Sequence, residues 1–192
     1  MSGAGPDPSV PASDPSADEA RLTALGSALV AAVDDALDGW TRTVVTDRLP
    51  GPPPDDLDGR LDTTVHDVRA AVVAPLRDLL ALDIDDQWTN PLSLIRRAAA
   101  GPTALLDELG AAPVERDADA ARIHPTDVYD LVPAAFADLG PEVHDAGLAW
   151  GAGKAHVHLS RRRRAAAAPV PSPDPPPADP PNHPLDPAGG SS

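Results

Sequence analysis

Apolar residues return every three or four positions along the first part of the chain, which is the rhythm of one face of an α-helix. They are Leu22, Leu25, Leu29, Val33, Leu37, Trp40 and Val44. Before them, Ser16 and Glu19 have the spacing of a capping box, in which a hydroxyl and a carboxylate accept hydrogen bonds from backbone N–H groups of the first turn. The pattern predicts a helix that begins at Ser16 and ends before Pro50.

A second stripe with the same rhythm runs from Leu57 to Leu79. The segment between the stripes, Leu49-Pro50-Gly51-Pro52-Pro53-Pro54, can support neither a helix nor the interior of a sheet. Two apolar stripes joined by a short stiff connector predict an antiparallel helical hairpin. Pro75 lies inside the second stripe. Because its ring would collide with the carbonyl of Ala71, we expect this helix to kink or stop near Ala74.

Proline and glycine mark the shorter helices that follow. Asn90-Pro91 combines a capping residue with proline at the first helical position, and Gly110 is suited to end the helical segment after it. We expect Gly101-Pro102 to bend or restart that segment, and residues 111–122 have the composition of a polar linker.

Two copies of the pattern P-x-x-x-x-D-L begin at Pro125 and Pro133. Two copies are too few for a repeat architecture. We expect each proline to open a single helical turn, and we expect Tyr129, Phe136 and Leu139 to pack against the bundle.

The last predicted helix, from Pro141 to about Arg164, is small or apolar nearly all round as far as Leu159. Helices of this kind are usually central. Gly147, Gly151 and Ala155 recur every four residues and would form a ridge that a neighbouring backbone can approach. Because each glycine costs roughly 1 kcal/mol relative to alanine inside a helix, close packing or a ligand should offset them.

Composition supports this assignment. Ala, Leu and Val carry most of a hydrophobic fraction of 42%, with only three Trp, one Tyr and one Phe. Ala and Leu favour helices, whereas strands prefer β-branched and aromatic residues. Residues 1–15 and 165–192 have too little apolar surface to offset the entropy of ordering. The sequence therefore predicts an all-α helical bundle at 16–164 between disordered tails, the second of them rich in proline.

Charge and the absence of cysteine narrow the functional classes. Thirty acidic against 15 basic residues give a formal net charge of −15, which repels nucleic acid and anionic membranes. Zero Cys excludes disulfides, thiolate metal sites and thiol nucleophiles. The chain shows no secretory signal and no apolar run of about 18 residues. We expect a cytoplasmic protein without a membrane partner.

The first candidate site lies on the last helix. Lys154 and His158 are one turn apart and share a face with Gly147 and Gly151. Two basic groups over a glycine floor could hold an anion or another small ligand. The alternative is that both are solvated residues near a helix end whose dipole favours cations. His156 points elsewhere, so the His-x-His pattern is no metal pair.

We expect neither a metal nor a cofactor. The chain has no H-E-x-x-H motif, and the stretch from Asp83 resembles a calcium loop only at its start. Trp88 stands where that loop needs glycine, and Leu94 stands where it needs glutamate.

The second candidate is a docking surface for a protein or an anionic ligand, made of Trp88, Asn90, Arg96 and Arg97. The alternative is that Trp88 holds its loop to the bundle and the arginines are solvated. A third feature, the run from Arg161 to Arg164, could contact nucleic acid or an acidic protein, although a helix dipole also favours arginines there.

The segments DQWTNPLSLIRRAAAGPT (85–102) and DVYDLVPAAFADLGPEVHDAGLAWGAGKAHVHL (127–159) resemble a family of uncharacterised small actinobacterial proteins. A single Lys against 14 Arg, with much Ala, Asp and Pro, fits a genome of high GC content. The resemblance covers about residues 20–160 and implies neither an activity nor functional residues.

Three functional classes are compatible with these features. The chain has no G-x-S-x-G motif and no glycine-rich phosphate loop, so we expect a non-enzymatic helical accessory protein that binds a protein partner or self-associates through an exposed helix face. The alternative is a small-molecule or anion-binding protein, even an enzyme, that uses Lys154 and His158 with help from Arg96 or Arg97. The third class, which we favour least, is a nucleic-acid accessory protein that binds through the arginine run.

Overall fold

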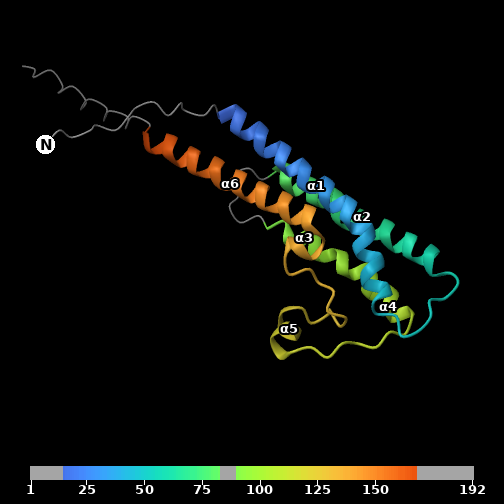
Figure 1. Ribbon diagram of the computed structural model, residues 1–192. Helices are drawn as coiled ribbons and strands as arrows, with labels where there is room; N and C mark the ends of the chain where they lie inside the picture. The colour runs from blue at the N-terminus through green and yellow to red at the C-terminus, as the bar shows by residue number, and fades with distance from the viewer. Residues whose placement is uncertain (1–14, 83–89, 168–192) are drawn as a thin grey trace, which may run out of the picture.

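The computed structural model describes residues 15–82 and 90–167, and within these residues every regular element is a helix, which confirms the all-α fold (Figure 1). The predicted tails lie outside the described residues, apart from Pro15 and residues 165–167. In chain order the elements are α1 (Pro15–Thr46), α2 (Leu57–Leu82), α3 (Leu92–Ile95), the 3-10 turn η1 (Arg96–Ala99), α4 (Ala100–Glu108), α5 (Ala118–Ile123), the 3-10 turn η2 (Phe136–Asp138) and α6 (Pro141–Ala167).

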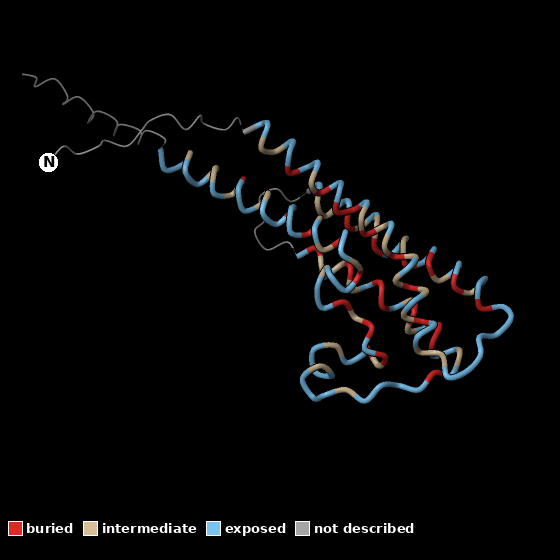
Figure 2. Tube along the Cα trace, in the orientation of Figure 1, coloured by how far each residue is buried: buried red, intermediate tan, exposed pale blue. Residues whose placement is uncertain are grey.

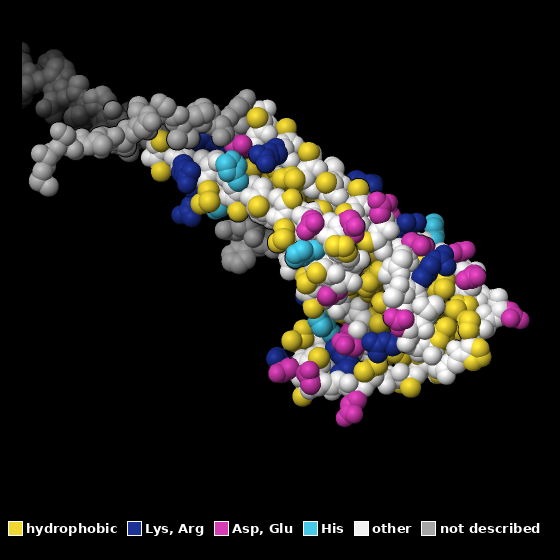
Figure 3. Space-filling view, in the orientation of Figure 1, with side chains coloured by type: hydrophobic (Ala, Val, Ile, Leu, Met, Phe, Trp, Pro, Cys, Tyr) yellow, Lys and Arg dark blue, Asp and Glu magenta, His cyan; other side chains and the backbone are white. Residues whose placement is uncertain are grey.

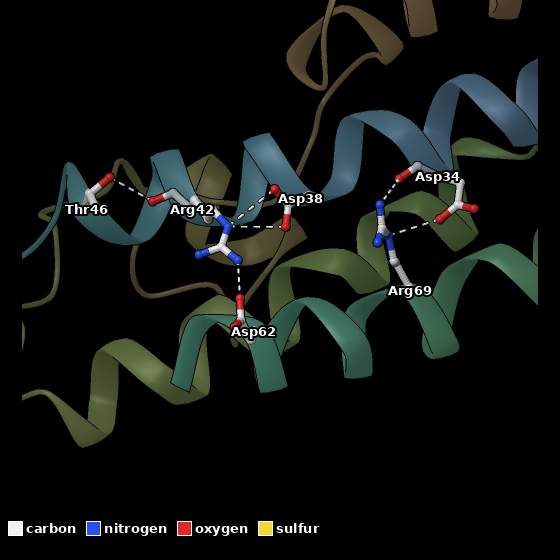
Figure 4. Close-up of polar contacts among 6 residues, drawn as sticks. All are labelled: Asp34, Asp38, Arg42, Thr46, Asp62 and Arg69. Carbon is white, nitrogen blue, oxygen red and sulfur yellow. Dashed lines mark hydrogen bonds and ion pairs between the residues drawn. The ribbon is translucent and has the colours of Figure 1, made fainter. Parts of the chain in front are cut away.

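Helices α1 and α2 form the predicted antiparallel hairpin, and ion pairs join them at two levels (Figure 4). Arg69 Nε lies 3.0 Å from Asp34 Oδ1. Nearer the connector, Arg42 donates hydrogen bonds to Asp62 of α2 and to Asp38 of its own helix. The bond to Asp62, and then that to Asp38, raise the pKa of Arg42 above its ordinary value.

The apolar stripes of the hairpin meet in the main core. The residues of α1 and α2 that are fully enclosed there are Leu29, Val33, Leu37, Val72 and Leu76. A second core joins the other end of the hairpin to α4 and the segment after α5, and its enclosed residues include Val45, Leu106 and Tyr129.

Two helix boundaries differ from the expectation. Helix α1 begins at Pro15, so Ser16 lies inside its first turn and not at its cap. Of the kink or stop expected near Ala74, the stop is wrong, because helix α2 continues through Pro75 to Leu82. Pro75 removes one backbone donor, and the carbonyl that loses this donor belongs to Ala71, which is exposed and can bond to water.

The helical run from Leu92 to Glu108 has the predicted ends. Asn90 caps its start, since Oδ1 accepts a hydrogen bond from the Leu92 N–H at 3.1 Å. At its end, Gly110 adopts φ +69°, and the Ala111 N–H donates to the Leu106 carbonyl as in a Schellman motif. A bend or restart was expected at Gly101-Pro102. The α-helical run is instead interrupted just before these residues, by the 3-10 turn η1.

The segment between α4 and α6 fits the prediction only in part. The expected polar linker contains α5, which begins where Asp117 accepts a hydrogen bond from the Ala120 N–H at 2.8 Å. No helix opens at Pro125, where the chain makes a turn. Tyr129 and Leu139 are buried and Phe136 packs on the main core, as expected. Residues 127–139 of this segment therefore pack on the bundle, whereas residues 112–126 contain no buried residue.

Helix α6 is not central. It lies along α1 at the edge of the bundle, and most of its other faces are exposed (Figures 1 and 2). Val143, Trp150 and Val157 are buried on the side facing the bundle, while Leu148 and Leu159 are exposed. The expectation failed because Ala and Gly carry little apolar area, so leaving them in water costs little.

Candidate functional site

A row of apolar residues runs along the outer face of α6. These residues, which we call the outer stripe, are Leu148, Ala152, Ala155 and Leu159, and all four are exposed. Their steps of four, three and four keep them within a sector of about 60°. Leu148 and Val157 are nine positions apart, so the outer stripe points about 180° away from the buried face of the helix. Helix α6 thus has one apolar face on the bundle and another in solvent.

The two leucines set the outer stripe apart from scattered surface residues. Leu148 is 59% exposed and Leu159 is 50% exposed, and both lie on one face of one helix. Isolated exposed leucines are ordinary, but an aligned row with heptad spacing is the pattern of a helix-pairing seam.

Charge is segregated along the same helix. Glu142 and Asp145 are exposed near its start, and Arg162 and Arg163 are exposed near its end. Figure 3 shows basic side chains toward the C-terminal end of α6 and apolar ones along the surface of the α1–α6 arm. The helix dipole favours this order of charges. The outer stripe is therefore flanked by acidic residues at one end and by basic residues at the other.

Contacts with α1 hold α6 in place. A Cβ atom on Gly153 would lie 2.6 Å from Leu25 Cδ1, so this glycine permits the close approach of α1. Farther along, Arg161 donates to Glu19 at 2.6 Å, and His156 Nε2 lies 3.6 Å from Asp18 Oδ1. The end of α6 is thus tied to the beginning of α1.

The residues of the first candidate site have different surroundings in the structure. Lys154 Nζ lies 5.3 Å from the centroid of the Trp150 ring, a cation–π distance, and both Lys154 and His158 are half-buried. Gly147 is buried under Phe136, because a Cβ atom there would overlap the Phe136 ring. The expected floor of an anion site is therefore filled at Gly147.

The predicted glycine ridge is wrong at Gly151. A Cβ atom at this position would meet nothing within 4 Å among the described residues. Ala155, the next residue of the ridge, is exposed. Gly147 and Gly151 lie one turn apart on the same face of α6, but Phe136 of η2 covers that face only at the level of Gly147.

The residues of the second candidate site have separate places in the structure. Trp88 lies outside the described residues, and Asn90 serves as a helix cap. Arg96 and Arg97 lie on one wall of a groove whose opposite wall includes His124. No motif joins residues 96–97 to His124 in the sequence, so sequence reasoning missed this grouping; the folded segment after α5 creates it.

Metal and membrane sites have no structural support in the described chain. Within residues 15–82 and 90–167, no group of three His, Asp or Glu side chains is placed to hold a metal ion. In the same residues, no helix is both long and apolar enough to cross a membrane.

The fold and the outer stripe define the class of protein as an all-α helical bundle with an exposed apolar helix face. Comparison with protein-family models, with curated proteins and with solved structures finds no match to this chain. The resemblance to small actinobacterial proteins stays a prediction.

Proposed function

We propose that this chain is a non-enzymatic helical interaction protein that pairs with a second copy of itself through the outer stripe of α6. The observation that carries the proposal is the alignment of Leu148, Ala152, Ala155 and Leu159 on one exposed helix face. Removing apolar surface from water is worth about 25 cal/mol per Å², so covering two half-exposed leucines from each copy favours association.

The spacing of the outer stripe suits an antiparallel pair. If the two helices cross between Gly153 and Lys154, Leu148 lies opposite Leu159 of the second copy, and Ala152 lies opposite Ala155 of the second copy. Every apolar residue of the stripe then has an apolar partner. The small alanines at the centre permit a short distance between the helix axes, since that distance depends on the side chains at the contact.

Charge favours the same orientation. In the antiparallel pair, Asp145 lies opposite Arg162 of the second copy, and this contact occurs twice by symmetry. In a parallel pair, the arginines of the two copies would lie beside one another and repel. The charge order of α6 therefore complements itself in one orientation only.

The expected affinity is modest. A stable protein interface buries roughly 1,200–2,000 Å² in total, and about four helical turns from each copy bury less than this. We therefore expect a dissociation constant of about 10–100 µM, in the range of transient complexes.

Sedimentation velocity across roughly 10–500 µM protein tests the pairing. The wild type should shift from monomer to dimer with concentration, and Leu148→Glu should stay monomeric because two charges would be buried in each interface. Ile123→Glu on α5 is a matched control, since Ile123 is also 59% exposed, and it should dimerise like the wild type. A wild type that stays monomeric at the highest concentration contradicts the proposal.

Charge reversal tests the orientation. Asp145→Arg alone and Arg162→Asp alone should each weaken the dimer, since each places like charges opposite one another. The double variant restores opposite charges across an antiparallel interface and should recover most of the lost affinity. No recovery in the double variant, with helicity unchanged by circular dichroism, would exclude the antiparallel arrangement.

A cytoplasmic location without a nucleic-acid partner belongs to the same proposal. A chain without cysteine gains nothing from an oxidising compartment, and its net charge of −15 opposes nucleic acid. Within the arginine run, Arg161 pairs with Glu19. Cell fractionation and a mobility-shift assay with duplex DNA test the two parts separately.

A further inference from the structure

A groove of about 500 Å³ lies between the helical segment from Arg96 to Asp107 and the segment from His124 to Val132. Sites for small molecules usually measure about 300–1,000 Å³. Alanines of η1 and α4 and the side chain of Val132 give it an apolar lining, and polar side chains stand around them. The groove is separate from the outer stripe, so a ligand bound in it would not depend on self-pairing of the chain.

Two arginines provide the strongest donors in the groove. Arg96 Nε donates to the Pro133 carbonyl at 3.1 Å, which fixes the half-buried side chain and leaves its two terminal nitrogens for other partners. Arg97 is exposed, and no hydrogen bond or ion pair of Arg97 occurs within the described parts of the chain. Thr103, His124 and Thr126 add hydroxyl and imidazole groups to the same groove.

The carboxylates that line the groove are already engaged by the protein. Asp127 is 4% exposed, and its two oxygens accept hydrogen bonds from the N–H groups of Leu131 and Val132 at 2.9 and 3.0 Å. Asp107 Oδ1 accepts a hydrogen bond from the Tyr129 hydroxyl at 2.6 Å. The acids of the groove thus serve the loop that forms its wall, while the arginines do not pair with them.

We infer that this groove binds a small organic anion, whose carboxylate or phosphate group is held by the guanidinium groups of Arg96 and Arg97. Guanidinium groups match the planar geometry of these anions and donate two parallel hydrogen bonds to them. The hydroxyls of Thr103 and Thr126 supply further donors, and the alanines accommodate an apolar portion of the ligand. A chain with a net charge of −15 attracts anions only where cations gather in this way.

A titration followed by ¹⁵N NMR tests the site, with inorganic phosphate and citrate as separate probes. Binding should move the amide signals of Arg97, Thr103 and Thr126 and should saturate. Stronger binding of citrate points to a carboxylate ligand, and stronger binding of phosphate points to a phosphorylated one. Arg97→Gln should weaken binding of the better probe by about tenfold, the loss expected for one charge-assisted contact.

The control is Arg122→Gln on α5, because Arg122 is exposed, lies outside the groove lining and pairs only with Asp119 in the described chain. It should bind like the wild type. Arg97 has no polar contact with the described residues, so Arg97→Gln should fold normally. Arg96→Gln also loses the hydrogen bond to the Pro133 carbonyl, so it tests the bond that fixes this side chain. The inference is overturned if neither probe saturates, if the shifts are confined to residues 161–164, or if Arg97→Gln binds as tightly as the wild type.

Discussion

Replacing Gly101 with alanine should destabilise the protein, although alanine is the better helix former. Gly101 lies in the first turn of α4 against α2, and an added Cβ would lie 2.6 Å from Val68 Cγ2 and 3.1 Å from Thr64 Cγ2. Real Cβ atoms do not approach other atoms this closely, so α4 or Val68 must move. Val68 is 2% exposed and β-branched, so its side chain cannot rotate away without a new clash.

The magnitude follows from two opposing effects. Overpacking a closely packed site costs about 1–3 kcal/mol. Alanine in place of glycine recovers up to about 1 kcal/mol of helix propensity. The net loss in the free energy of unfolding is therefore about 0.5–2 kcal/mol, which corresponds to a fall in Tm of a few degrees for a chain of this size.

Gly151→Ala is the matched control, since a Cβ atom at Gly151 would meet nothing within 4 Å in the described structure. It carries the same change of residue without the clash, and it should stabilise the protein by about 0.5–1 kcal/mol. Urea unfolding followed by circular dichroism gives both values, with equal m-values as the sign that the unfolded states are comparable. If Gly101→Ala is as stable as the wild type or more so, α4 does not pack as closely on α2 as the clash with Val68 requires.

Two further substitutions test the packing of the segment after α5 and the cap at the start of α3. Tyr129→Phe removes the hydroxyl that donates to Asp107, and that bond, followed by burial, raises the pKa of Tyr129 above its ordinary value of 10.0. The stabilisation is complete below pH 10.0 and is lost as the pH rises through the raised pKa, so the wild type should lose its advantage over Tyr129→Phe in strongly alkaline urea titrations. Asn90→Ala should cost about 1 kcal/mol by removing the acceptor for the Leu92 N–H, and an unchanged unfolding midpoint would show that Asn90 is no cap.

The hairpin was predictable because its stripes consist of large side chains. Leu29, Val33 and Leu37 are spaced for one helix face and have the area to drive burial, so local pattern and tertiary packing agree. The stop at Gly110 was predictable for a similar reason, since glycine adopts positive φ without strain.

The features that could not be predicted from the sequence depend on contacts between distant segments. Gly147 and Gly151 are the same residue type in the same helix, yet Phe136 covers one of them and nothing described covers the other. Helix α5 carries no apolar stripe, and its terminal carbonyls are bonded by Arg116, whose terminal nitrogens donate to His124 and Ala120. Neither arrangement leaves a periodic signal in the sequence. The groove beside Arg97 depends on this same segment and was missed for the same reason.

The leucines of the outer stripe require an explanation other than helix formation. Arg, Lys, Gln and Glu form helices about as well as leucine, so polar residues at 148 and 159 would keep α6 helical and would avoid exposing apolar surface. Packing on α1 does not need them either, because Trp150, Gly153 and Val157 provide that contact on the opposite face. The two leucines lie at equal distances from the centre of the stripe, with alanines between them and opposite charges beyond them. This symmetry suits the proposed pairing with a second copy in the reverse direction.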